Sequence, residues 1–172
     1  MKFMQFLIGI SLFLFSEISI AVCPGGTSYQ TEMLSYVNAF RAQGGVCGTT
    51  KYPGVGKLVL NGQLNAASLG HAKDMAAKNY FNHVNLAGKS PTDRIRATGY
   101  LTGASGWSTG ENIGAGTLRN NAQTQFSAWK NSPAHCANML SGKYKHLGIS
   151  CAYTSTSQYK HYWVMNLGRN GK

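Results

Sequence analysis

The side chains best suited to chemistry are two histidines and one glutamate. His83 follows a Tyr-Phe-Asn run just after a predicted helix ends, and His135 falls in the first turn of another predicted helix. Glu111 lies in a glycine-rich apolar strip, where a carboxylate is costly to bury without a partner. No basic residue lies between Arg96 and Arg119 to supply one locally. We therefore expect the three side chains to converge in one cleft, with His135 favoured over His71, His146 and His161 as a partner of Glu111.

Three kinds of site remain open for these residues. Two neutral imidazoles and one carboxylate, here His83, His135 and Glu111, are the ligand set of an open zinc site with water in the fourth position. The same trio could form a hydrogen-bonded polar cluster without metal or turnover. A hydrolase would also need a nucleophile, and Ser132 is the hydroxyl nearest to His135 in sequence. Ser132 lies at an apparent helix N-cap, however, where we expect backbone to engage its oxygen.

The other three histidines have ordinary structural explanations. His71 lies inside a predicted helix with Asp74 three residues further on, which predicts a local surface pair. His146 and His161 border or occupy predicted strands, where histidine is common without any special role.

Helices are predicted to come first along the chain. The three-and-four spacing of Met33, Leu34, Val37 and Phe40 indicates an amphipathic helix over 28–43. The sequence Ser90-Pro91-Thr92-Asp93 is a capping box with proline at the first helical position, so a short helix should end at Gly99. By similar signals, further helices are predicted over 61–79, 121–131 and 132–140.

Strands are predicted near the end of the chain. Segments 146–153 and 159–167 are rich in β-branched and aromatic residues, and the polar segment 154–158 between them predicts a hairpin. Segment 103–116 holds five glycines, which predicts a loop or an irregular strand approached closely by other backbone. Helices first and strands later indicate an α+β domain.

The N-terminus has the pattern of a secretory signal peptide. Lys2 is followed by an apolar run from Phe3 to Phe15 and then by the small residues Ser19 and Ala21 at the cleavage-site positions. The run is shorter than the ~20 residues that a membrane span requires, and no later segment approaches that length. We expect a signal peptide over 1–21, a single domain over 22–172 with no transmembrane segment, and a secreted or periplasmic location.

The four cysteines fit two disulfides in an exported protein, because none forms a C-x-x-C pair. Three pairings exist, and closure of local loops favours Cys23 with Cys47 and Cys136 with Cys151. The alternative for Cys23 is a lipid-modified N-terminus, which the branched Val22 before it disfavours.

The composition is strongly basic. Sixteen Lys and Arg face five Asp and Glu, for a net charge of +11, which favours anionic envelope or membrane surfaces as partners. The bases are scattered singly and no recognition motif accompanies them, so we expect no nucleic-acid partner. We also expect a monomer.

A series of motifs, in order and spacing from about Tyr29 to Gly168, resembles the CAP superfamily of cysteine-rich secretory, antigen 5 and pathogenesis-related 1 proteins. The chain is most similar to the bacterial secreted members with an SCP-like domain. The matching pieces are Tyr80-Phe81-Asn82-His83, Gly88-Lys89-Ser90-Pro91 with Asp93-Arg94-Ile95, Gly110-Glu111-Asn112-Ile113, Trp129-Lys130-Asn131-Ser132-Pro133-Ala134-His135, Asn138-Met139-Leu140, His146-Leu147-Gly148-Ile149 and Tyr162-Trp163-Val164.

The resemblance implies a three-layer α-β-α sandwich around a mainly antiparallel sheet, with a central cleft lined by two histidines and two acids. His83, Glu111 and His135 match three of those four positions. The fourth is commonly a glutamate and falls here on Ser132, which removes one potential ligand and one potential base. Most members resemble binding or signalling modules, although proteolytic and metal-dependent activities have been proposed for some and sterol or fatty-acid binding is implied for others.

Together these observations favour a secreted CAP-domain protein that acts as an extracellular binding or effector module, at the cell envelope or on a host, rather than an enzyme. The first alternative is a metal-assisted or His/Glu-dependent hydrolase of peptide or cell-wall bonds. The second is lipid or sterol binding. None of these functions requires a cofactor, except that the metal-assisted form of the hydrolase would use a divalent ion such as zinc.

Overall fold

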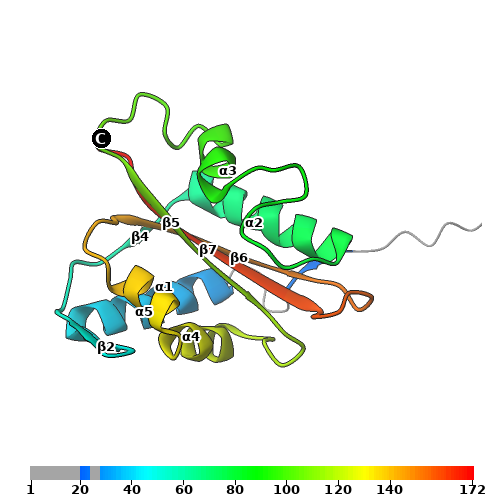
Figure 1. Ribbon diagram of the computed structural model, residues 1–172, viewed down its shortest axis with the longest axis horizontal. Helices are drawn as coiled ribbons and strands as arrows, with labels where there is room; N and C mark the ends of the chain where they lie inside the picture. Colours follow the sequence, from blue (N-terminus) through cyan, green and yellow to red (C-terminus); the bar gives the residue numbers. More distant parts are fainter. Residues whose placement is uncertain (1–19, 24–27) are drawn as a thin grey trace, which may run out of the picture.

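The computed structural model describes residues 20–23 and 28–172, so the predicted signal peptide lies almost wholly outside the described residues. Figure 1 shows a twisted sheet with α2 and α3 on one face and α1, α4 and α5 on the other. The expected α+β sandwich is therefore confirmed. The elements are β1 (Ala21–Val22), α1 (Ser28–Gln43), β2 (Gly45–Cys47), β3 (Thr50–Tyr52), β4 (Val59–Leu60), α2 (Gly62–Lys78), α3 (Pro91–Ala97), β5 (Ser108–Ala115), α4 (Ala122–Lys130), α5 (Pro133–Leu140), β6 (His146–Tyr153) and β7 (His161–Arg169).

The central sheet runs in the order β1-β6-β7-β5, and β4 pairs with β6 in parallel. The hairpin predicted near the end of the chain is confirmed as β6 and β7, which pair antiparallel from His146 opposite Gly168 to Tyr153 opposite His161. No helix within the described ranges has the length and apolar character that crossing a membrane requires.

The glycine-rich segment differs from its prediction, because β5 is a regular strand of eight residues paired with β7 along its whole length. Its glycines are approached by side chains rather than by backbone. An added Cβ would overlap the Tyr144 ring at Gly110 and the Gln125 amide at Gly114. These glycines therefore make room for neighbouring side chains on a strand that pairs normally.

The helix positions agree with the sequence. Ser90 and Asp93 form the expected capping box of α3, each side chain accepting a bond from the backbone N–H of the other. Gly148 on β6 lets α2 pack closely, because a Cβ there would collide with the backbone of Leu64. On the opposite face, the Trp129 indole Nε1 donates to the Ile113 carbonyl (2.9 Å) and fixes α4 against β5.

Both disulfides are long-range, and the prediction of local pairs was wrong. Cys23 is bonded to Cys151 and Cys47 to Cys136. The first pair follows from the ladder, because β1 lies antiparallel beside β6 and the Cys23 N–H donates to the Cys151 carbonyl. The second joins the end of β2 to the buried face of α5. The prediction was wrong because it paired cysteines that are close in sequence. Because its sulfur is in a disulfide, Cys23 is also not available for a lipid anchor.

Candidate functional site

Glu111 is the centre of a buried ion-pair group. Its side chain is 2% exposed, and its two carboxylate oxygens bind different partners. Oε1 lies 2.8 Å from His83 Nδ1, and Oε2 lies 2.7 Å from Arg94 Nη2. Directly opposite on β7, Asn166 donates to Oε2 (3.2 Å) in the amide orientation that also lets its oxygen accept from Ser68. The carboxylate is thus fully engaged by protein groups.

Arg94 is a residue that the sequence analysis missed. It comes from α3, and besides Glu111 its guanidinium donates to the carbonyls of His83 (2.9 Å) and Lys89 (2.8 Å). One side chain therefore ties the loop after α2 to both α3 and β5. The sequence did indicate that Glu111 needs a cationic partner. The spacing of residues alone, however, could not show that α3 lies against β5 and supplies it.

His135 does not contact Glu111 in the way the sequence analysis favoured. Its Nδ1 lies 2.8 Å from Ser132 Oγ, one turn earlier at the start of α5. The expected capping role of Ser132 was also wrong, because its side chain makes no cap hydrogen bond. Asn112 instead holds this helix on β5, since its Nδ2 donates to the His135 carbonyl (3.1 Å). The histidine partner of Glu111 is His83, which comes from the loop after α2.

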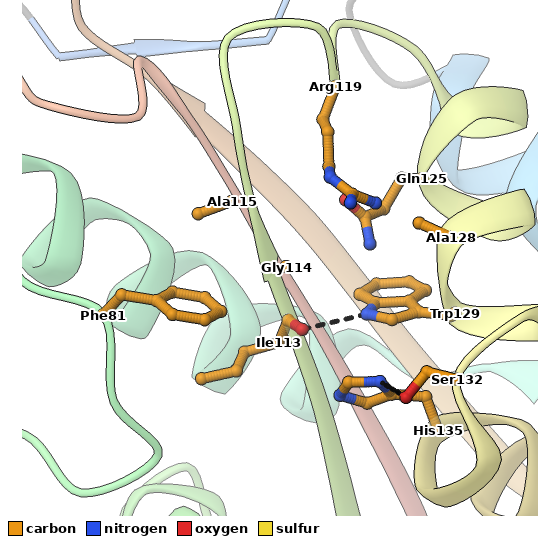
Figure 2. Close-up of a pocket in the computed structure, with 10 residues that line it drawn as sticks. All are labelled: Phe81, Ile113, Gly114, Ala115, Arg119, Gln125, Ala128, Trp129, Ser132 and His135. Atoms are coloured by element: carbon orange, nitrogen blue, oxygen red, sulfur yellow. Dashed lines mark hydrogen bonds between the residues drawn. The ribbon is translucent and has the colours of Figure 1, made fainter.

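His83 and His135 nevertheless line one cavity, with a volume of about 340 Å³ and with Phe81, Asn82 and Ile113 as its other walls. The His83 side chain is 48% exposed there. A second cavity of about 230 Å³ shares Phe81, Ile113 and His135 with the first, so the two adjoin. Figure 2 shows this second cavity, with Arg119 and Gln125 at one end, Ser132 and His135 at the other, and Trp129 between them. We call the two cavities together the His83/His135 cleft.

The polar groups of the cleft include the cationic Arg119 and the imidazole of His135. Burial lowers the pKa of His135 below its ordinary value, and electrostatic repulsion from His83 and Arg119 lowers it further. An imidazole with a lowered pKa is neutral near pH 7, so His135 is able to accept as well as donate a hydrogen bond. The cleft therefore offers uncharged and cationic polar groups above apolar walls.

His71 is buried rather than at the surface, so its predicted pairing with Asp74 was wrong. It is 1% exposed, and its Nε2 lies 2.9 Å from the Asn82 carbonyl. Asp74 is engaged by Lys78 and by the Tyr80 hydroxyl instead. Because α2 turns this face toward the loop that carries His83, His71 helps to fix the backbone beside the cleft.

The donor set does not fit the zinc site that the sequence left open. Within residues 20–23 and 28–172, no three His, Cys, Asp or Glu side chains gather as a metal site. Glu111 has both oxygens committed to His83 and Arg94, which leaves two imidazoles where a catalytic zinc uses three protein ligands. Glu111 is therefore better described as the group that orients His83.

Comparisons with known proteins agree with this architecture. Residues 34–167 match the cysteine-rich secretory protein (CAP) family. The uncharacterized protein YkwD of Bacillus subtilis is 27% identical over 125 residues, which cover 72% of this chain and 42% of that protein. The chain thus spans about two fifths of the length of that relative.

Two solved structures share the fold. An extracellular protein of Bacillus anthracis that contains an SCP domain superposes with a TM-score of 0.65 at 22% identity, over 83% of this chain and 41% of that one. An outer surface protein of Borrelia burgdorferi superposes with a TM-score of 0.66 at 17% identity, over 83% of this chain and 93% of that one. At these identities the likeness concerns the fold alone.

Proposed function

This chain belongs to the cysteine-rich secretory protein (CAP) family, and from that premise we propose that it is an exported binding module that holds a ligand in the His83/His135 cleft. The observation that carries the proposal is that the Glu111 carboxylate, which lies beneath the cleft, is fully engaged by protein groups. Both Glu111 oxygens are occupied and the side chain is 2% exposed, so Glu111 positions His83 and is not free to act as a base or a metal ligand. An open cavity with fixed polar groups and apolar walls is suited to binding.

Export is the second part of the proposal. Two disulfides in one small domain are typical of proteins that fold outside the reducing cytoplasm. The two solved structures above are described as extracellular and outer surface proteins, respectively. Cleavage of a signal peptide after Ala21 would leave Val22 paired with Ala152 and Cys23 bonded to Cys151. Mass analysis of the exported protein should find Val22 as the first residue, and an uncleaved N-terminus would contradict this part.

Binding is tested by titrating the oxidised protein with four classes of small compound: N-acylated amino acids, short-chain fatty acids, N-acetylated sugars and zinc. The histidine ring signals in NMR report the site. A ligand in the cleft should shift the signals of His83 and His135 and leave His146, which is hydrogen-bonded to Tyr100 at the far end of β6, unchanged. The His135→Gln variant should lose the response and His146→Gln should keep it. If no class shifts His83 or His135, the proposed function is wrong.

Hydrolysis is the second candidate, and one contact favours it. The 2.8 Å approach of Ser132 Oγ to His135 Nδ1 places a hydroxyl beside a base of lowered pKa. Across the described residues, however, no carboxylate orients that imidazole, as the third member of such a site would. Turnover of an activated ester such as p-nitrophenyl acetate that disappears in both Ser132→Ala and His135→Gln would favour the enzyme over the binding module.

A further inference from the structure

A buried amide lines the His83/His135 cleft. Gln125, on α4, is fully buried, and neither its amide nitrogen nor its amide oxygen has a hydrogen-bond partner within the described protein. Gly114 creates the space for it, because a Cβ there would overlap the amide. Buried polar groups are nearly always paired, so an amide left with both functions free indicates a partner from outside the chain.

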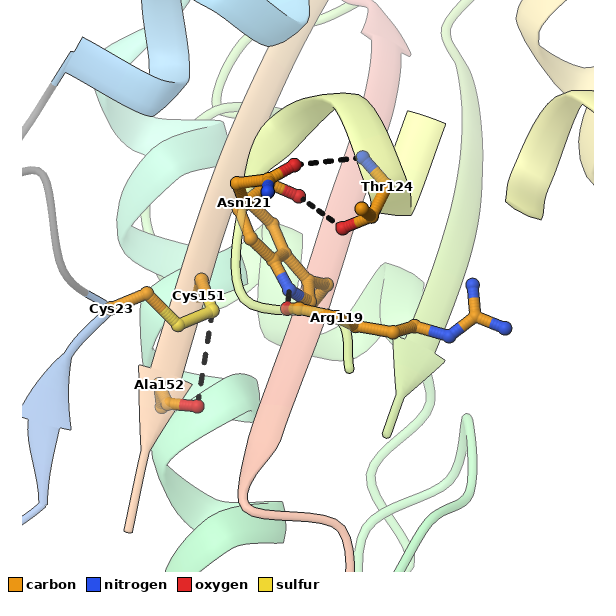
Figure 3. Close-up of a disulfide and its surroundings, with 7 residues drawn as sticks. Cys23, Arg119, Asn121, Thr124, Cys151 and Ala152 are labelled. Carbon is orange, nitrogen blue, oxygen red and sulfur yellow. Dashed lines mark hydrogen bonds between the residues drawn. A yellow bond between two sulfur atoms is a disulfide. The ribbon is translucent and has the colours of Figure 1, made fainter. Parts of the chain in front are cut away.

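A cation lies at the same end of this cavity. Arg119 is half-buried, its side chain packs across Gly116, and its carbonyl accepts a bond from the Trp163 indole (2.6 Å). Figure 3 shows the side chain extending from its loop away from the Cys23–Cys151 disulfide. No Asp or Glu of the described chain lies within ion-pair distance of the guanidinium. The backbone of Arg119 is thus fixed, while its guanidinium has no acidic partner among the described residues.

The chemistry of the two groups selects the ligand. A guanidinium binds a carboxylate or a phosphate through two parallel hydrogen bonds. The neighbouring walls, formed by Phe81, Ile113 and Trp129, are apolar and favour the more weakly hydrated carboxylate with an apolar side chain attached. A primary amide donates from its nitrogen and accepts at its oxygen, so it pairs with either the N–H or the C=O of a trans peptide bond. A fatty acid would satisfy Arg119 but leave Gln125 unpaired.

We propose that this end of the cleft binds the C-terminal residue of a peptide, with its carboxylate on Arg119, its last amide on Gln125 and its apolar side chain against Trp129. The inference rests on the proposed function and names the class of ligand for that cleft. Capture of a terminal carboxylate is a recurring mode of peptide recognition.

Three small probes separate the parts of this ligand. N-acetyl-L-leucine carries the carboxylate, the amide and the apolar side chain, N-acetyl-L-leucinamide lacks the carboxylate, and 4-methylpentanoate lacks the amide. Binding is followed by NMR through the ring signal of His135 and the indole signal of Trp129. We expect N-acetyl-L-leucine to bind at least about tenfold more tightly than either of the others, the effect of losing one good hydrogen-bonded contact.

Variants then assign the contacts. Arg119→Gln should weaken N-acetyl-L-leucine about tenfold or more and leave N-acetyl-L-leucinamide unchanged, whereas Lys73→Gln, the same charge change on the exposed face of α2, should alter neither. Gln125→Met keeps the shape and removes the unpaired amide, so it should weaken N-acetyl-L-leucine about tenfold without lowering the midpoint of urea unfolding.

The outcomes are distinct. Equal binding of N-acetyl-L-leucine and its two truncated relatives, or full affinity in Gln125→Met, would overturn the assignment, because a water molecule would then satisfy Gln125. If another class in the four-class titration binds the cleft and N-acetylated amino acids do not, the peptide assignment is wrong while the binding function stands. If no class binds, the binding function itself fails.

Discussion

Arg94 Nη2 lies 2.7 Å from Glu111 Oε2, and this contact joins α3 to β5 beneath the cleft. Both side chains are largely buried, at 11% and 2% exposed, and the same arginine holds two carbonyls of the loop that carries His83. The pair therefore determines where His83 stands, although neither residue lines the cavities.

Removing one partner of this pair should be strongly destabilising. We expect Glu111→Ala to lower the free energy of unfolding by about 3 to 5 kcal/mol, because Arg94 would keep a buried charge without its counterion. Urea unfolding measures the loss. Glu32→Ala, which removes an exposed carboxylate on α1, is the control and should change the free energy by less than about 0.5 kcal/mol. Equal effects of the two variants would contradict the buried ion pair.

The sequence predicted the features that neighbouring residues determine, which are the helices and the final hairpin. It did not predict contacts between elements that are far apart in the chain. Apolar spacing, the capping box at Ser90 and the β-rich end of the chain were sufficient for the helices and the final hairpin. The need of Glu111 for a partner was also visible. Which cation supplies it was not, because Arg94 and His83 reach β5 only after α3 and the loop following α2 pack against the strand.

The cysteines show the same limit more plainly. Closure of short loops favoured Cys23 with Cys47, but β1 pairs with β6 and brings Cys23 to Cys151, 128 residues away. Ser132 was misjudged for a related reason. Its position before a proline indicates an N-cap, but the His135 ring one turn later competes for the hydroxyl.

Peptide mapping of the unreduced protein should recover the Cys23–Cys151 and Cys47–Cys136 pairs. Both bridges close long loops and should stabilise the fold mainly by restricting the unfolded chain. The double variant Cys23→Ser with Cys151→Ser should therefore lose about 2 to 5 kcal/mol of unfolding free energy in urea. A peptide linking Cys23 to Cys47 would refute the observed pairing.

Stability should fall in mild acid, and His71 should contribute to the fall. Burial lowers its pKa below the ordinary value of 6.5, and the nearby Arg94 lowers it further, against the opposing pull of Glu111, Asp74 and the Asn82 carbonyl. The imidazole then binds a proton more readily in the unfolded chain than in the native state. The contribution of neutral His71 to the free energy of unfolding is therefore complete above about pH 6.5 and is lost as the pH falls toward the lowered pKa.

The matched variant is His71→Gln, whose amide can still donate to the Asn82 carbonyl but does not titrate. Its urea midpoint should change less than that of the wild type between about pH 7.5 and about pH 5. Burial also lowers the pKa of His135 and His161, so part of the acid sensitivity should remain. An identical pH dependence in variant and wild type would exclude His71 as a source.

Adsorption to anionic surfaces should depend steeply on salt. The sequence carries a net charge of +11, and exposed bases occur on both helical layers and at the sheet ends, among them Lys51, Lys73, Lys130, Lys143, Lys145 and Arg169. Exposed charges are screened over about 10 Å at 0.1 M salt and about 3 Å at 1 M. Cosedimentation with phosphatidylglycerol vesicles should therefore be strong at low salt and vanish well before 1 M, and phosphatidylcholine vesicles should retain nothing.

Two variants separate this adsorption from binding in the cleft. Lys143→Gln combined with Lys145→Gln removes two exposed charges and should reduce vesicle binding at low salt, because the attraction is a sum over the basic surface. Gln125→Met leaves the net charge unchanged and should sediment like the wild type. Retention that persists at 1 M salt, and is lost in Gln125→Met, would instead mean that the cleft itself holds a lipid group, and the electrostatic account of envelope association would be wrong.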